Sequence, residues 1–252
     1  MSGRLVVVGL GPGPDRWVTE AARVALQDAD FVLGYSAYTD RLVPRAGQTI
    51  EASDNREELS RAERALTLTH EGRRVVVVSG GDPGVFAMAA AVFEAVERGP
   101  HVWRTLDIRV EPGVTAMLAA AAQVGAPLGH DFCAISLSDN LKSWDVIAKR
   151  LRLAAEAGLV IALYNPASKA RPEQIGKAFE VLQETCAADT VVVLARAVGR
   201  SDEDIEITTL GRAQEAIVDM RTLVLVGSAA TRLIAKPDGS AWVYTPRYAE
   251  EA

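Results

Sequence analysis

Along the first half of the chain, short apolar runs alternate with segments whose apolar residues recur at helical spacing. The apolar runs predict strands at residues 5–8, 31–33, 75–78 and 106–110. The helical spacing predicts helices at residues 18–29, 54–72 and 85–97, and Asp54 with Glu57 resembles a capping box at the start of the second helix. This alternation is typical of βαβ units, so we expect a mostly parallel sheet in this half.

The second half repeats the alternation with different proportions. Strands are predicted at residues 133–137, 159–164, 191–195 and 223–226, and helices at 116–124, 144–157 and 172–185. Two late strand signals, at residues 205–208 and 242–244, are hairpin-like and favour a mixed sheet. The best boundary is the Glu111-Pro112-Gly113 turn, which predicts two α/β lobes, residues 1–113 and 114–252, with an active site in the cleft between them.

Three turns rich in small residues follow three of the predicted strands. They are Gly9-Leu10-Gly11-Pro12-Gly13, Gly80-Gly81-Asp82-Pro83-Gly84 and Glu111-Pro112-Gly113-Val114-Thr115-Ala116, called here the first, second and third turns. Open α/β sheets bind ligands beyond the carboxyl ends of their strands, so the turns predict a binding crevice. For Asp82 a local alternative stays open, because aspartate before a proline is also typical of a helix N-cap.

The first turn does not match the dinucleotide-binding pattern. That pattern needs a third glycine where this chain has Pro14, and an acid after the second strand, whereas Asp30 precedes that strand. The chain also contains no Gly-Lys-Ser or Gly-Lys-Thr sequence. An NAD-dependent oxidoreductase on a doubly wound sheet is therefore a disfavoured alternative.

Composition narrows the class of protein. The chain has 252 residues, 49% of them hydrophobic, and a formal net charge of −6, which argues against a nucleic-acid binder. The sequence has neither a secretory signal nor an apolar run of membrane-spanning length, so we expect a cytoplasmic protein without a membrane partner. The two cysteines indicate no disulfide framework, and the three histidines lack metal-ligand spacing, so no metal is expected.

In their order and spacing, the three turns resemble those of the tetrapyrrole methylases, and the resemblance covers nearly the whole chain. It implies a two-lobed enzyme that methylates a tetrapyrrole with S-adenosylmethionine and acts as a homodimer. Within the family, residues 34–38, 135–139, 162–169 and 198–200 are most similar to the members that methylate C17 of precorrin-3B and contract the ring to precorrin-4 in cobalamin biosynthesis. The alternatives are methylation of cobalt-factor III in the anaerobic route, or of another precorrin.

The resemblance also implies which residues bind the cofactor. They are Pro12 in the first turn, Gly80, Gly81, Asp82 and Val85 in and after the second, Thr115 and Ala116 in the third, and Tyr164 with Asn165 at a later strand end. At Tyr164 the register could shift by one residue. The chain departs from many relatives at residues 53–57, where they have a glycine-containing segment.

Methyl transfer from a sulfonium needs positioning and exclusion of water more than catalytic side chains. The ring contraction implied by the resemblance also needs proton transfer, for which hydroxyl and carboxyl groups at strand ends are the candidates. We select Asp15, Ser138, Asp139 and Tyr38. A turn or helix-cap role is at least as compatible with each of them.

A tetrapyrrole with many carboxylates needs cations in its binding site. Eight arginines and lysines lie near predicted strand ends, namely Arg41, Arg45, Arg56, Lys142, Lys169, Arg171, Arg196 and Arg200. About a third to half of them are expected to contact substrate, since most surface arginines are merely solvated. As substrate-binding candidates we select Arg41, Arg45, Lys142, Lys169 and Arg200.

Overall fold

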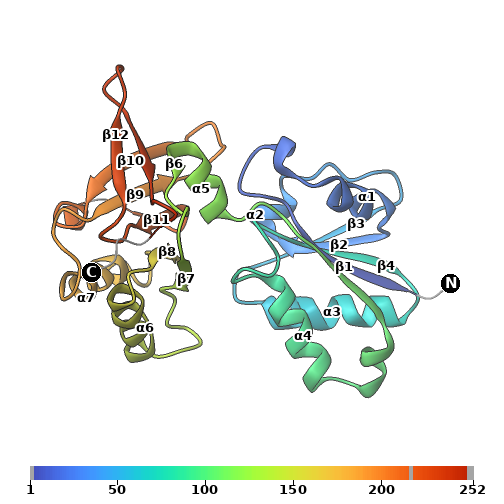
Figure 1. Cartoon of the computed structure of the whole chain (residues 1–252). Coiled ribbons are helices and arrows are strands. Elements are labelled where there is room, and N and C mark those ends of the chain that lie inside the picture. The colour runs from blue at the N-terminus through green and yellow to red at the C-terminus, as the bar shows by residue number, and fades with distance from the viewer. Residues whose placement is uncertain (1–2, 216–217, 249–252) are drawn as a thin grey trace. The chain divides into compact units, whose positions relative to one another are not determined.

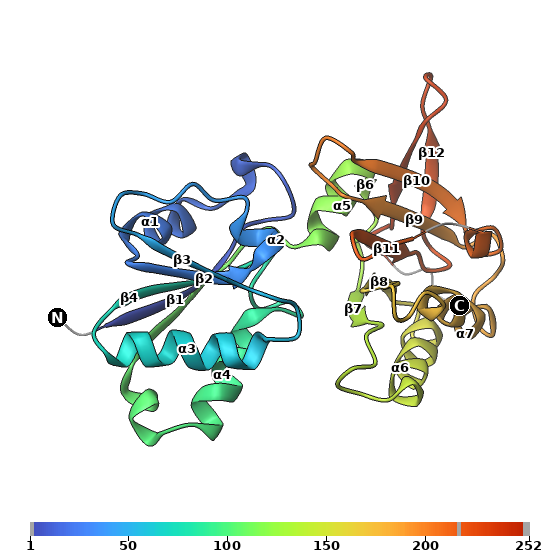
Figure 2. The same ribbon diagram turned by 180° about the vertical axis from the view of Figure 1, so that it is seen from behind.

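The computed structural model of the chain describes residues 3–215 and 218–248. The chain divides into two compact units, Met1–Ala116 and Met117–Ala252 (Figure 1). Figure 2 gives the reverse view of the same ribbon.

The first unit is built on a parallel five-stranded sheet. Its strands are β1 (Arg4–Gly9), β2 (Phe31–Tyr35), β3 (Thr49–Ser53), β4 (Arg74–Ser79) and β5 (Asp107–Glu111), in the order β3-β2-β4-β1-β5. Its helices are α1 (Glu20–Asp28), α2 (Ser36–Thr39), α3 (Glu58–His70) and α4 (Met88–Arg98), with 3-10 turns η1 (Asp15–Trp17) and η2 (His101–Thr105). Every strand pair is parallel, which confirms the sheet type expected for this half.

Helices cover both faces of this sheet (Figure 1). Alternate residues of β1 enter different cores: Leu5 and Val7 pack with residues of α3 and α4, whereas Val6 and Val8 pack with residues of α1. All four side chains are at most 5% exposed. The continuous apolar run of β1 is explained by this burial on two faces.

Three features of the first unit differ from the sequence prediction. Strand β3 was not predicted, because it is an edge strand whose residues are all half-buried or exposed and therefore carry little apolar signal. Helix α3 begins at Glu58 rather than at Asp54, although the Asp54 N–H does donate to the Glu57 carboxylate at 3.0 Å. Helix α4 begins at Met88 rather than at residue 85, because the second turn continues to Ala87.

The second unit contains a mixed sheet with the order β10-β9-β11-β8-β7. Its strands are β7 (Phe132–Ser136), β8 (Val160–Tyr164), β9 (Val191–Arg196), β10 (Asp204–Thr209) and β11 (Thr222–Val226). Its helices are α5 (Ala116–Val124, which begins at the unit boundary), α6 (Trp144–Glu156) and α7 (Gln174–Gln183), with the 3-10 turn η3 (Ala213–Glu215). Within the described strands of this five-stranded sheet, only β7 and β8 pair in parallel, so the mixed sheet expected for this half is confirmed.

A smaller sheet of β6 (Gly125–Ala126), β12 (Arg232–Ala235) and β13 (Ala241–Tyr244) completes this unit. Strands β6 and β12 were not predicted, since β6 has two residues and β12 is exposed throughout. Helices α6 and α7 contribute Ile147, Leu151 and Phe179 to the core of the larger sheet. None of the helices in residues 3–215 and 218–248 is both long and apolar enough to span a membrane.

Candidate cofactor and substrate site

The strand order of the first unit creates a switch point between β4 and β1. The connection after β1 runs through α1 on one face, and the connection after β4 runs through α4 on the other. Loops that leave adjacent parallel strands toward opposite faces define the usual ligand position in open α/β sheets. The first and second turns are these two loops.

Main-chain hydrogen bonds join the first turn to the second. The N–H of Gly11 donates to the carbonyl of Gly81 and the N–H of Gly81 to the carbonyl of Gly11, both at 3.1 Å. Gly11 and Gly81 both have φ +65°, a left-handed backbone conformation that residues other than glycine rarely adopt. The glycines here are therefore required by the backbone itself.

Asp82 joins the second turn to the third. Its Oδ1 accepts from the N–H of Gly84 at 2.7 Å, and its Oδ2 accepts from the N–H of Gly113 at 3.0 Å. The N-cap residue of α4 is Ala87, so the alternative in which Asp82 caps that helix is wrong. The carboxylate instead fixes the positions of two turns.

The third turn packs directly against the first two. A Cβ on Gly113 would lie 2.3 Å from the Gly81 carbonyl oxygen, and one on Gly9 would lie 2.5 Å from the same atom. Contacts this short do not occur for real side chains, so glycine at both positions permits the approach. A Cβ on Gly81 would lie 3.7 Å from the Thr115 Cα and 3.9 Å from the Ala116 nitrogen. The structure thus brings together Gly81, Asp82, Thr115 and Ala116 from two turns.

Pro12 and Val85 extend this cluster along the chain. Pro12 follows Gly11 and is half-buried, and the N–H of Val85 donates to the Asp82 carbonyl at 3.3 Å. Phe86, which we did not select from the sequence, has φ +52° with its side chain 52% exposed. A positive φ at an aromatic residue is uncommon and is concentrated at functional sites, but sequence alone gives no signal for it.

Two residues of the segment after β2 contact these turns. The Arg41 guanidinium donates to the carbonyls of Leu10 at 2.9 Å, Gly11 at 3.3 Å and Gly13 at 2.9 Å. The Tyr38 ring covers Gly80, because a Cβ at Gly80 would lie 2.7 Å from ring carbons of Tyr38. Arg41 thereby stabilises the first turn, and Tyr38 the second.

Arg45 and Asp15 are placed differently. Arg45 donates to the carbonyls of Gln27 at 2.6 Å and Ala29 at 2.8 Å, just before β2 begins, so it lies at the amino end of that strand. Asp15 is exposed in η1, and its backbone carbonyl accepts from Arg23. The structure does not bring Arg45 to the glycine turns.

In the second unit, the adjacent carboxyl ends of β7 and β8 gather other candidates. The Asn165 side-chain amide donates to the Ser136 hydroxyl at 2.9 Å, and Asn165 has φ +55°. The Tyr164 hydroxyl accepts from the N–H of Met117 at 3.2 Å, which connects β8 to the start of helix α5. Tyr164 and Asn165 are thus neighbours of the segment that follows β7.

Two cations contact that segment. Arg171 donates to the Ser138 hydroxyl at 3.0 Å and to the Asp139 carboxylate at 3.3 Å. The Lys142 ammonium donates to the Ser138 carbonyl at 3.2 Å. Burial lowers the pKa of Lys142, Arg150 lowers it further, and Asp139 opposes the change. Arg171 was considered from the sequence but not selected, and its contacts place it beside two catalytic candidates.

The remaining cations differ in their surroundings. Lys169 is exposed in the tight turn between Ser168 and Arg171, and Arg200 is exposed after β9. Arg196 is paired with Asp219 at 2.8 Å and Asp202 at 3.2 Å. Within the described residues, no group of three or more His, Cys, Asp or Glu side chains is arranged to hold a metal ion.

The fold and the joined turns agree with the comparison to known families. The model of the family described as Tetrapyrrole (Corrin/Porphyrin) Methylases matches residues 4–214. The chain belongs to this family, and it is a methyltransferase by its fold and sequence.

Individual relatives are similar over nearly their whole length. The chain is 56% identical over 248 residues to a precorrin-3B C(17)-methyltransferase of Sinorhizobium sp, covering 98% of both chains. It is 41% identical over 229 residues to a probable cobalt-factor III C(17)-methyltransferase of Salmonella typhimurium, covering 90% of this chain and 93% of that one. A solved structure of the methyltransferase CobJ superposes with a TM-score of 0.92 at 52% identity, covering 97% of this chain and all of that one.

Proposed function

We propose that the protein transfers a methyl group from S-adenosylmethionine to C17 of precorrin-3B and couples this transfer to contraction of the ring, as a step of cobalamin biosynthesis. The single observation that carries the proposal is the 56% identity over 98% of both chains to a precorrin-3B C(17)-methyltransferase. Similarity at this level over a whole chain favours a shared substrate more strongly than a shared fold would.

The chemistry of the three turns fits the proposed cofactor. They offer mainly peptide carbonyls and N–H groups, together with the Asp82 carboxylate and the hydroxyl of the buried Thr115. Carbonyls and a carboxylate suit a positively charged sulfonium, and peptide N–H groups suit the carboxylate of its methionine part. When bound, S-adenosylmethionine supplies the electrophilic methyl group, and the turns would hold it in line with the attacking carbon, about 3 Å away. We assign Pro12, Gly80, Gly81, Asp82, Val85, Thr115, Ala116, Tyr164 and Asn165 to cofactor binding.

Asp15, Ser138, Asp139 and Tyr38 stay our candidates for the proton transfers of ring contraction. The contact of the Tyr38 ring with Gly80 supports Tyr38, because it lies beside a turn assigned to the cofactor. The contacts of Arg171 support Ser138 and Asp139, because one guanidinium holds both side chains next to each other. Asp15 has no comparable support.

For the acidic substrate we propose Arg41, Arg45, Lys142, Lys169 and Arg200 as ligands. Lys142 has the strongest support, since a partly desolvated ammonium gains most from a carboxylate partner. Arg45 has the weakest, because its donors bind carbonyls at the amino end of β2.

The decisive experiment is incubation of the purified protein with precorrin-3B and methyl-labelled S-adenosylmethionine, followed by mass spectrometry and absorbance spectroscopy. The proposal expects a product with one labelled methyl group at C17 and the spectrum of a contracted ring. Labelled product without contraction would leave methyl transfer supported and remove the second half of the proposal.

Cobalt-factor III is the alternative substrate, and the 41% identical Salmonella typhimurium relative is the observation that favours it. A parallel incubation with cobalt-factor III separates the two by rate. The oxidoreductase alternative is tested by thermal unfolding with S-adenosylhomocysteine, NAD and ATP, because a ligand at about a hundred times its dissociation constant adds about 2.7 kcal/mol to the free energy of unfolding. Stabilisation by NAD alone would overturn the methyltransferase proposal.

We also propose that lobes 1–113 and 114–252 are the functional domains and that the enzyme is a cytoplasmic homodimer. The compact units Met1–Ala116 and Met117–Ala252 support the first point. Exposed Ile234 and Trp242, which are paired across β12 and β13 and share one face, support an interface between subunits, since clustered apolar side chains on a surface mark association sites. Light scattering of the purified protein tests the dimer.

A further inference from the structure

Arg61 is the one charged side chain that is buried in the part of the chain that the structure describes, with 5% of its surface exposed. It lies in the first turn of α3. Its guanidinium donates from Nε to the Ser53 hydroxyl at 2.7 Å, from Nη2 to the Asp54 carbonyl at 2.8 Å and from Nη1 to the Met88 sulfur at 3.2 Å. None of these acceptors carries a negative charge, so a buried cation is held here by neutral partners only.

This arrangement is costly without a counterion. A buried charge needs an opposite charge or a complete set of hydrogen bonds, and a guanidinium has five N–H groups, of which three have acceptors here. Burial lowers the pKa of Arg61, and the charges of Glu58, Glu57 and Tyr38 oppose this change. The position is therefore suited to an additional anion.

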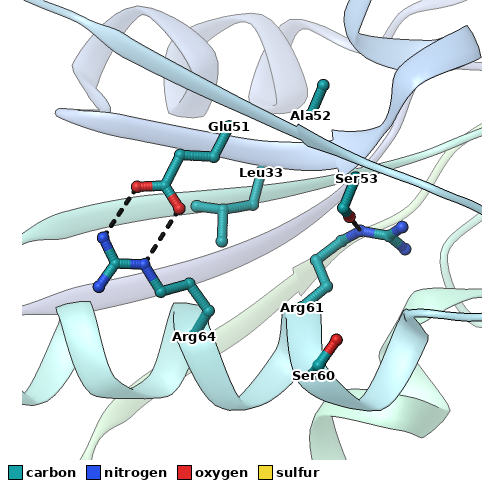
Figure 3. A pocket seen from close by; sticks show the side chains of 7 residues that line it. All are labelled: Leu33, Glu51, Ala52, Ser53, Ser60, Arg61 and Arg64. Atoms are coloured by element: carbon teal, nitrogen blue, oxygen red, sulfur yellow. Dashed lines mark hydrogen bonds and ion pairs between the residues drawn. The ribbon is translucent and has the colours of Figure 1, made fainter.

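Arg61 is one of the residues that line a small pocket (Figure 3). Its volume is about 150 Å³, and its lining includes Glu51, Ser53, Ser60, Arg61 and Arg64. Arg64 and Glu51 form a two-pronged pair at 2.9 and 3.0 Å, so their charges cancel and the unbalanced charge is that of Arg61. One water occupies about 30 Å³ in the liquid, so the pocket has room for a carboxylate group and accompanying water.

The pocket lies near the carboxyl ends of the strands of the parallel sheet. Ser53 is the last residue of β3, and the carboxyl ends of parallel strands lie on the same side of the sheet, which here also carries the first and second turns. Met88, the sulfur partner of Arg61, begins the helix that follows the second turn. Ser53 accepts from Arg61, which leaves its hydroxyl proton available to a ligand.

We propose that this pocket is a carboxylate subsite, in which Arg61 and Ser53 bind either an acidic side chain of the tetrapyrrole substrate or a small free carboxylate. The first source depends on the proposed function, and the second does not. Arg61 is buried beside a pocket. It differs in this from the cations selected from the sequence, which are exposed or donate to backbone carbonyls.

The test uses the full chain, the variants Arg61→Gln, Arg61→Lys and Ser53→Ala, and the control Arg74→Gln. Arg74 pairs with Asp30 at the start of β4, so the control removes one positive charge at the amino ends of the strands of the same sheet. Fluorescence titration measures the affinity for uroporphyrin, a stable tetrapyrrole with eight carboxylates, and calorimetry measures the affinity for S-adenosylhomocysteine. Thermal unfolding in sodium acetate and in sodium chloride of equal ionic strength measures the effect of a free carboxylate.

For a substrate subsite, Arg61→Gln weakens uroporphyrin binding by about ten- to a hundredfold, as expected for a lost charged hydrogen bond. Arg61→Lys restores part of the affinity, Ser53→Ala loses less, and Arg74→Gln changes it by less than about threefold. The affinity for S-adenosylhomocysteine is unchanged throughout. If Arg61→Gln fails to fold, Arg61→Lys and Ser53→Ala carry the same comparison.

For a free-carboxylate subsite, acetate raises the unfolding temperature of the wild type above its value in chloride, and the Arg61 variants lose this increase. That result supports a free-carboxylate subsite. If the wild type binds neither uroporphyrin nor S-adenosylhomocysteine, the proposed function is rejected, but the acetate result still supports the subsite. The subsite is overturned if folded Arg61→Gln binds uroporphyrin with wild-type affinity and acetate stabilises neither the wild type nor this variant.

Discussion

The Asp82 carboxylate accepts a hydrogen bond from the backbone N–H of Gly113 at 3.0 Å, across 31 positions of the chain. Its other oxygen accepts from the N–H of Gly84 within its own turn. One side chain thus sets the distance between the second and third turns. Motifs that are far apart in the sequence become one surface through this contact.

Asp82→Ala is expected to lower the free energy of unfolding by about 1.5–3 kcal/mol, because it removes hydrogen bonds to a charged acceptor. Asp82→Asn is expected to be nearly as harmful, since its amide offers one acceptor oxygen and directs an N–H₂ group at the other backbone donor. Urea unfolding and calorimetry with S-adenosylhomocysteine measure both effects. Asp28→Asn, which changes an exposed carboxylate 3.5 Å from Arg4, is the control and should change neither quantity appreciably. Normal cofactor affinity in folded Asp82→Ala would contradict the assignment.

Gly113→Ala is expected to displace the third turn, because its Cβ would lie 2.3 Å from the Gly81 carbonyl oxygen. We expect a loss of stability of about 1–3 kcal/mol and weaker binding of S-adenosylhomocysteine. Gly176→Ala is the matched control: it adds the same methyl group in α7, where no atom lies within 4 Å of the new carbon apart from its chain neighbours and the surrounding backbone of the same helix. That change should stabilise the protein by about 0.5–1 kcal/mol and leave binding unaltered. Equal behaviour of the two variants would show that the turn contact is unimportant.

Arg41 and Arg45 each donate to three backbone carbonyls, Arg41 in the first turn and Arg45 around the start of β2 and at Ala46. Alanine at either position should lower stability by a similar amount, about 1–3 kcal/mol. Only Arg41→Ala should also weaken S-adenosylhomocysteine binding, by about tenfold. Calorimetry on both variants makes the comparison. Loss of tetrapyrrole binding in Arg45→Ala would support the proposed role of Arg45 as a substrate ligand.

Tyr38→Phe keeps the ring that covers Gly80 and removes only the hydroxyl. If that hydroxyl transfers a proton, turnover should fall by about a hundredfold or more while cofactor affinity stays normal. Tyr38→Ala removes the ring as well and should reduce both quantities. Full turnover by Tyr38→Phe, measured with precorrin-3B by mass spectrometry, would leave the ring as the functional part of the residue.

We expect Asp202 to contribute to the acid stability of the second unit. Hydrogen bonds from Arg221 lower the pKa of Asp202 from 3.8 to about 2, with a smaller contribution from Arg196. A carboxylate with a lowered pKa stabilises the fold above its unfolded-state value, and this contribution is lost as the pH falls from 3.8 to about 2. Urea midpoints measured across this range should fall more steeply for the wild type than for Asp202→Asn. Parallel curves would show that the pairing does not contribute in solution.

Local sequence patterns predicted much of the fold. Residues 5–8 and 75–78 were identified as strands because they are apolar on both faces, and β1 and β4 are buried on both faces. Strand β3 was missed because an edge strand needs no continuous apolar run. The start of α4 was misplaced by three residues, since no local preference predicts the left-handed Phe86 that prolongs the turn.

The sequence by itself determined that three glycine-bearing turns follow three strands, because glycine and proline act on their own backbone. Only the tertiary structure decided that these turns meet, that Asp82 reaches Gly113 rather than capping a helix, and that Arg41 and Arg45 lie at opposite ends of the strands. It also revealed the buried charge of Arg61, which in the sequence is one arginine among many on a helix. The physical reason is that these properties depend on strand order, which places β4 beside β1 across some seventy residues, and hydrophobic periodicity does not encode that order.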